Sequence, residues 1–156
     1  MQSRMRNPML VIPDVMPAVM SMAQALNTPC VSQTIVNLVS LRASQVNGSS
    51  VCVDLFTRNA RNAVETDGRL FSLAAWWDAA CFDDAERAAI ALCEEVTRMS
   101  DRSKPVSDET WNEAAQHFSE EALAVLILTI GMVNSGNRVN AATRQNVNEC
   151  ECPPTK

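Results

Sequence analysis

The chain has 156 residues and a formal net charge of −5, with 47% hydrophobic and 20% charged residues. This is the composition of one globular domain rather than of a disordered chain. A surface this acidic argues against nucleic acid as a partner, because a polyanion is bound through basic side chains.

The N-terminal residues do not follow the pattern of a signal peptide, because the apolar run after Arg4 and Arg6 is broken by Pro13 and Pro17. The longest apolar run, residues 122–133, is about half of the roughly 20 residues that a membrane-spanning helix needs. The six cysteines form no regular framework, so we expect them to be reduced. These features predict a cytoplasmic protein with no membrane partner.

Helices are favoured throughout, because Gly is scarce, Tyr is absent and Ala, Leu, Met and Glu are common. Asp14 is placed to cap a first helix over residues 14–26, and a second helix fits residues 31–45. Asn47-Gly48 ends the second helix, since Gly readily adopts the left-handed conformation after a C-terminus.

Ser49 opens a third helix, to about residue 65, and Cys52, Phe56 and Ala60 recur at helical spacing on its expected buried face, which continues to Ala63 and Val64. A short helical turn follows over residues 70–80.

Asp83 and Glu86 form a capping box at the start of a fourth long helix. Ser107 and Ser119 are placed to cap the fifth and sixth. The sixth is apolar nearly all round over residues 122–133, which predicts a central helix or a subunit interface.

We therefore expect an all-α, multi-helical bundle. Residues 14–144 form the domain, residues 1–13 an N-terminal arm, and residues 145–156 a flexible tail in which Cys150 and Cys152 are spectators.

One stretch indicates a chemical site. Ser49, Cys52 and Phe56 are spaced by three and four residues and so share one helical face. Cys52 lies in the first helical turn, where free backbone N–H groups and the helix dipole favour a thiolate. Two interpretations stay open: a reactive thiol, or a small hydrophobic residue buried in the core.

Four segments carry a resemblance to a known family: LRASQVNG (41–48), ERAAIALCEEVTR (86–98), HFSEEALAVLILTI (117–130) and VNSGNR (133–138). With a helix bearing Cys52 after the first of them, the chain resembles the alkylhydroperoxidase D-like, carboxymuconolactone decarboxylase-like family over roughly residues 14–144. The resemblance implies the bundle of that family and a homo-oligomer.

The resemblance also implies a site. Peroxidase members carry Cys-x-x-Cys-x-x-x-His with a Glu twelve residues before the first Cys; the second Cys attacks the peroxide, the first resolves the sulfenate, and the His and Glu remove the proton. Here the attacking position is Cys52, whereas Ser49, Phe56 and Asn37 stand at the resolving, base and relay positions. Without the resolving thiol no local disulfide can close, and general-base help is commonly worth about 10²–10⁴ in rate.

The first hypothesis is therefore an alkylhydroperoxidase-like protein with a degenerate redox site. If it is an enzyme, it is a hydroperoxide reductase with at most slow, one-cysteine antioxidant activity. The alternative is a non-catalytic oligomeric binding or regulatory protein, with a hydroperoxide or a small apolar molecule as the expected ligand. A decarboxylase-like enzyme would need acid and base residues that the pattern lacks. The single histidine, His117, has an expected structural or solvated role, so neither a metal site nor a cofactor is predicted.

Overall fold

The computed structural model describes residues 2–101 and 103–147. Cys150, Cys152 and most of the expected flexible tail lie outside these residues. Within them every regular element is a helix, which confirms the all-α prediction. The elements are α1 (Pro8–Val11), α2 (Val15–Ala25), α3 (Gln33–Asn47), α4 (Ser50–Asn62), α5 (Asp67–Ser72), η1 (Leu73–Ala75), α6 (Asp84–Thr97), η2 (Met99–Asp101), α7 (Asp108–His117) and α8 (Glu120–Thr143).

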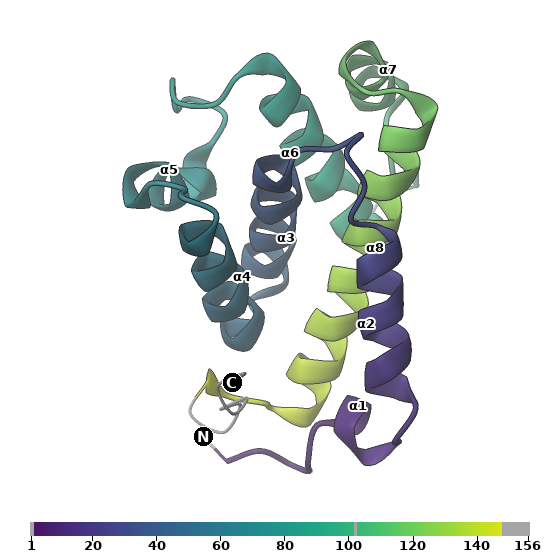
Figure 1. Ribbon diagram of the computed structural model, residues 1–156. Helices are drawn as coiled ribbons and strands as arrows, with labels where there is room; N and C mark the ends of the chain where they lie inside the picture. Colours follow the sequence, from purple (N-terminus) through teal and green to yellow (C-terminus); the bar gives the residue numbers. More distant parts are fainter. Residues whose placement is uncertain (1, 102, 148–156) are drawn as a thin grey trace.

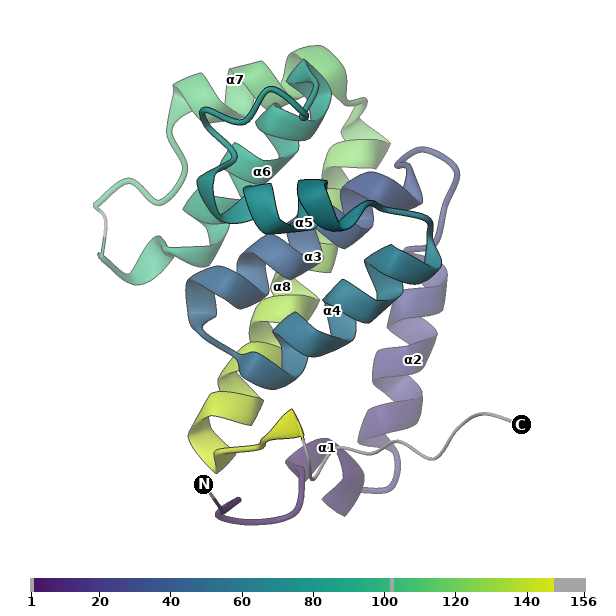
Figure 2. The same cartoon turned by 90° about the vertical axis from the view of Figure 1, so that its left-hand side faces the viewer.

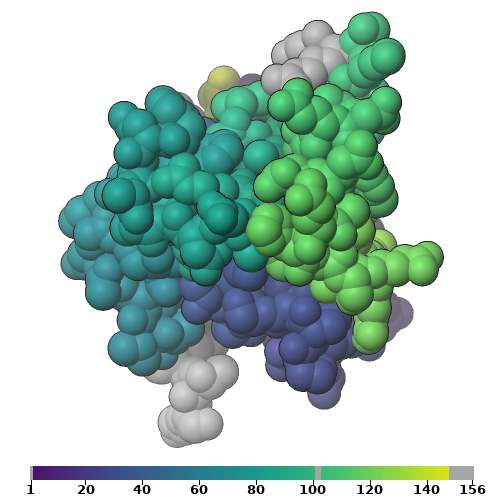
Figure 3. Space-filling model, turned by 90° about the horizontal axis from the view of Figure 1, so that it is seen from above, coloured from purple at the N-terminus to yellow at the C-terminus, as the bar shows by residue number. Residues whose placement is uncertain are grey.

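The central helix is α3, which packs against α4, α6 and α8 (Figures 1 and 2). Its residues 37–44 are all buried, so that this stretch has no solvent-facing side. One apolar cluster fills the space between α3, α6, α7 and α8, and a second fills the space between α3, α4, α5 and α6. Seen from above, α7 lies beside the teal segment that contains α5 and α6 (Figure 3).

The last helix, α8, is mostly buried between residues 122 and 133, as its composition predicts. It is not buried all round, however: Ala124, Leu128 and Gly131 form a stripe that faces solvent, with Leu128 47% exposed. By length and mean hydropathy α8 would be able to cross a membrane, but half of its most apolar window is buried inside the protein. Such burial is typical of a core helix in a globular protein.

Most of the predicted caps are confirmed. Asp83 and Glu86 form the capping box at the start of α6, and the hydroxyls of Ser107 and Ser119 accept backbone N–H groups at the starts of α7 and α8. Asp14 precedes α2 as predicted, but its side chain makes no capping hydrogen bond.

The third predicted helix is shorter than expected. It ends at Asn62 as α4, and Val64 follows with a φ of +68°. The expected buried positions Ala63 and Val64 are therefore exposed, because the chain has already turned away from the core. Residues 70–80 divide into the end of α5, η1 and a turn.

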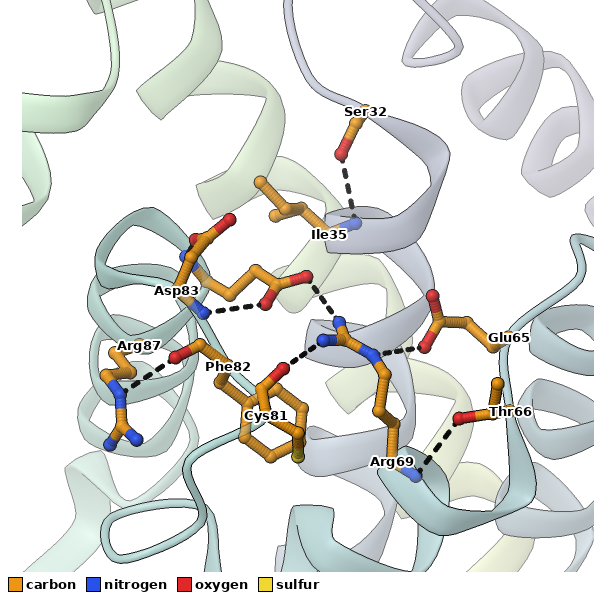
Figure 4. A network of polar contacts seen from close by, with 10 residues as sticks. Ser32, Ile35, Glu65, Thr66, Arg69, Cys81, Phe82, Asp83 and Arg87 are labelled. Atoms are coloured by element: carbon orange, nitrogen blue, oxygen red, sulfur yellow. Dashed lines mark hydrogen bonds and ion pairs between the residues drawn. The ribbon is translucent and has the colours of Figure 1, made fainter.

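Arg69 fixes this turn region to α6 (Figure 4). Its guanidinium donates to the carboxylate of Glu65 over 2.9 Å, to the carboxylate of Glu86, and to the carbonyl of Cys81. The same guanidinium lies 5.0 Å from the centre of the Phe82 ring, within cation–π range. One side chain therefore holds α5 and the start of α6 in place beside α3.

The N-terminal segment passes the C-terminal end of α8, and α2 then lies on the outside of the bundle (Figures 1 and 2). The backbone N–H of Arg4 donates to the carbonyl of Thr143 over 2.9 Å, and its side chain donates to Ala142. These bonds satisfy carbonyls at the helix end that have no partner within the helix. Neither α1 nor α2 contains a buried residue.

Candidate functional site

Cys52 lies in the first turn of α4 and is 6% exposed. Its sulfur accepts a hydrogen bond from Nδ2 of Asn140 over 3.2 Å. The other end of that amide, Oδ1, accepts from Nδ2 of Asn7 over 3.3 Å. The N-terminal segment thus fixes the amide orientation that presents a donor to the thiol.

Ser49 occupies the N-cap position of α4, but its hydroxyl does not cap the helix. The residue is buried, and its Oγ has no hydrogen-bond partner among the described residues. Its backbone N–H donates to the carbonyl of Ser44, which closes the tight turn around Gly48 (φ +66°). The position that the resemblance assigns to a resolving thiol therefore holds a buried, unpaired hydroxyl.

Asn37 and Phe56 line a different space, a cleft of about 660 Å³ between α2, α3, α4 and α8. Oδ1 of Asn37 accepts from Nε2 of Gln33 over 3.1 Å, whereas its Nδ2 has no partner among the described residues. Cys52 is not among the residues that line the cleft. The structure therefore separates the four motif positions into two pairs: the buried Ser49 and Cys52, and the cleft residues Asn37 and Phe56.

The cleft is chemically neutral. None of the described residues that line it is an Asp, Glu, Lys, Arg or His. Its polar groups are amides and hydroxyls, among them Gln24, Gln33 and Asn59, and its apolar wall includes Phe56 and Met132. Such a space offers no general base, but it offers hydrogen bonds and an aromatic face to an uncharged molecule.

Three asparagines on α8, spaced by three residues, form a buried row that the sequence reasoning missed. Asn134 accepts from Asn47 over 2.6 Å and donates to Thr97 over 3.2 Å. Asn140 contacts Cys52, and Asn137, fully buried between these two positions in the helix, has no partner for either side-chain polar atom among the described residues. The row could have been predicted from the sequence, because the three asparagines recur at helical spacing directly after the apolar part of the same helix.

A charged network between α3 and α6 stabilises the bundle. The carboxylate of Glu94 accepts from Arg42 over 2.7 Å and from the indole N–H of Trp76 over 2.9 Å. Burial alone would disfavour its ionisation, but these hydrogen bonds and the charges of Arg42 and Arg98 outweigh burial and lower the pKa of Glu94.

The other cysteines among the described residues, Cys30, Cys81 and Cys93, do not join the site. Burial raises the pKa of Cys93 to about 12, and its thiol donates to the carbonyl of Val39 over 3.1 Å. Cys81 is exposed and Cys30 is partly buried. His117 is exposed at the end of α7, with Nε2 3.4 Å from the carboxylate of Glu113, so it lies in a solvated position as the sequence indicates.

Solved structures show the same fold. A protein of unknown function from Agrobacterium tumefaciens, provisionally assigned to antioxidant defence as AhpD, superposes with a TM-score of 0.85 at 23% identity, over 93% of this chain and 97% of that one. The debrominase Bmp8, in a cysteine-to-alanine variant bound to 2,3,4-tribromopyrrole, gives 0.80 at 20% identity, over 89% and 73%.

The sequence comparisons bear on the family as well as on the fold. The uncharacterized protein YdfG of Bacillus subtilis (strain 168) is 33% identical over 132 residues, which are 85% of this chain and 88% of YdfG. The sequence model of the carboxymuconolactone decarboxylase family matches residues 13–95, which are more than half of the chain. The matched part contains α2 to α5 and nearly all of α6. The chain therefore belongs to the carboxymuconolactone decarboxylase family.

Proposed function

We propose that this protein binds a small uncharged molecule in the cleft between α2, α3, α4 and α8. The observation that carries the proposal is the neutral lining of the cleft, in which both Asn37 and Phe56 take part while Cys52 does not. A volume of about 660 Å³ lies within the range of small-molecule sites. The structure of Bmp8 with tribromopyrrole supports it by showing a small aromatic molecule on this fold.

The test is ligand-observed NMR with a panel of uncharged aromatic and aliphatic fragments. Val36 lines the cleft, so Val36→Trp should fill it and abolish binding of the hits. Leu55 is exposed on α4 and does not line the cleft, so Leu55→Trp is the matched control and should bind as the parent does. Hits that bind equally well to both variants would contradict the proposal.

A second candidate is slow, one-cysteine hydroperoxide reduction at Cys52, favoured by the donor that Asn140 presents to the sulfur. The Cys52 thiolate would attack the terminal oxygen of a hydroperoxide, giving a sulfenic acid and releasing an alcohol after protonation. Two molecules of an external thiol would then return the sulfenic acid to the thiol, with water and a disulfide as products.

Slow turnover is expected, because Phe56 cannot accept the proton and Ser49 cannot resolve the sulfenate. The measurement is consumption of cumene hydroperoxide with dithiothreitol as reductant, with Cys52→Ser as the control. A rate that Cys52→Ser leaves unchanged would exclude this candidate.

The proposed assembly is a homo-oligomer in the cytoplasm. Its support is apolar surface left uncovered by the single chain: Met20 on α2 is 63% exposed, and Leu10 and Leu128 are about half exposed. The four cysteines within the described residues are free thiols, as is usual in a reducing compartment.

A further inference from the structure

We infer that Asn37 is the residue that selects the ligand of the cleft, and that the ligand carries a hydrogen-bond acceptor oxygen on an apolar or aromatic body. This inference rests on the proposed binding function. It adds the ligand's chemical class and the group that recognises it.

The first step concerns which end of the Asn37 amide is free. Gln33 lies one helical turn earlier on α3, and its Nε2 donates to Oδ1 of Asn37 over 3.1 Å. Oδ1 is therefore occupied within the protein, and Nδ2 is left with two N–H groups and no partner among the described residues. The end of the amide that lacks a partner is a donor, and it is buried in the unliganded protein.

The second step concerns the cost of that arrangement. Asn37 is 4% exposed, and a buried polar group without a hydrogen bond destabilises the folded protein. Because the residue lines the cleft, a rotation of its side chain would bring this donor to a molecule in the cleft, which would supply the missing acceptor. A carbonyl or ether oxygen satisfies such a donor, whereas an alkyl group does not.

The third step concerns the rest of the molecule. A charged ligand would be desolvated in the cleft without an opposite charge to compensate, because no described lining residue is ionisable. Phe56 on α4 and Val36 on α3 form apolar parts of the same wall. An aromatic ketone, ester or amide combines the body that these side chains favour with the acceptor that Asn37 needs.

The experiment compares acetophenone with ethylbenzene, which have similar apolar bodies and differ in the carbonyl. Dissociation constants come from NMR titrations of the full chain. One hydrogen bond is worth about 0.5–1.5 kcal/mol, so acetophenone should bind up to about tenfold more tightly. Asn37→Leu should remove this preference without weakening the binding of ethylbenzene. Asn112→Leu, at an exposed amide on α7 outside the lining, should keep it.

The unliganded protein provides a second readout. Asn37→Leu removes an unpaired buried donor, so its melting temperature should rise relative to the parent. Asn37→Asp keeps the shape but replaces the donor, and it too should lose the preference for acetophenone.

The possible failures are distinct. If neither probe binds, the proposed binding function fails together with the inference. If both probes bind equally and Asn37→Leu changes neither, binding in the cleft stands and the role of Asn37 is overturned. A preference for aniline over acetophenone that Asn37→Leu abolishes would show that the amide presents its oxygen, which also overturns the inference.

Discussion

The amide of Asn140 donates from Nδ2 to the sulfur of Cys52 over 3.2 Å, across 88 residues of sequence. The same thiol is 6% exposed and lies outside the cleft, which restricts the access of any reagent. The thiol of Cys52 thus has an amide donor as its partner and little contact with solvent.

Limited access predicts slow chemical modification of Cys52. In the folded protein iodoacetamide should label the exposed Cys81 first, and Cys52 at least about tenfold more slowly. The measurement is a time course of alkylation followed by peptide mass mapping, and labelling in guanidinium chloride, where both thiols are exposed, is the control. Equal rates in the folded protein would mean that α4 opens readily or that Cys52 is activated.

Restoring the missing motif positions should restore chemistry. The triple variant Ser49→Cys, Phe56→His and Asn37→Glu supplies a resolving thiol, a base and a relay carboxylate together. On addition of cumene hydroperoxide we expect a disulfide between Cys52 and the thiol introduced at position 49, measured by loss of free thiol and by mass. The parent chain is the control, and hydroperoxide-dependent disulfide formation in the parent would show that another cysteine resolves the sulfenate.

Apolar surface on α1 and α2 predicts self-association. Light scattering at micromolar concentration should give at least twice the chain mass of 17.1 kDa. The double variant Leu10→Glu with Met20→Glu should shift the protein toward a monomer, because it places charges on that surface. Phe71 is exposed on α5, and Phe71→Glu serves as a control that should keep the oligomer. A parent that is monomeric under these conditions would refute the prediction.

The low pKa of Glu94 predicts acid sensitivity. Because the folded state lowers this pKa below its ordinary 4.5, the pair with Arg42 stabilises the protein above that pH. This contribution should be lost as the pH falls from about 4.5 through the lower, folded-state pKa. Glu94→Gln should cost about 2 kcal/mol at pH 7, on the scale of hydrogen bonds to charged groups.

Urea unfolding from pH 7 down to pH 3 measures this effect. The stability difference between the parent and Glu94→Gln should shrink toward the acid end of the range. The matched control is Glu109→Gln, at an exposed carboxylate on α7, which should leave the profile unchanged. A difference that stays constant with pH would contradict the assignment.

Two glycines should respond oppositely to the same change. Gly48 has a φ of +66° at the end of α3, where a Cβ is strained, so Gly48→Ala should lower the free energy of unfolding by about 1–2 kcal/mol. Gly131 lies within α8 with open space around its Cα, so Gly131→Ala should raise it by about 1 kcal/mol. Thermal or urea unfolding of both variants is the measurement, and a destabilised Gly131→Ala would point to a neighbouring subunit at that position.

Local signals in the sequence were enough to predict the helices. The capping box at Asp83 and the stop at Gly48 act through residues within one turn, so their outcome does not depend on the rest of the chain. The family resemblance rests on equally local segments, and the family match confirms it. Local signals do not reveal how the helices pack. That α3 is the central helix depends on which of its faces the other helices cover.

The arrangement of the site could not be predicted from such local signals. The spacing of Ser49, Cys52 and Phe56 places them on one helical face, but it does not reveal that Phe56 borders the cleft while Cys52 is enclosed. Nor does it reveal Asn140 as the partner of Cys52, because that contact joins α4 and α8. Side-chain pairs distant in sequence are fixed by the packing of whole helices, which one sequence without an alignment does not specify.

The bonds between Arg4 and the end of α8 join residues 138 and 139 positions apart. Closing so long a loop is entropically unfavourable until the helices between have formed, so this segment should dock last during folding. It should equally be the first to detach, and its release would free Asn140 from Asn7. Amide hydrogen exchange at Arg4 would then report a local opening that loosens the partner of Cys52 while the core remains intact. Through that opening, the N-terminal segment would govern how long the amide of Asn140 keeps its donor directed at the thiol.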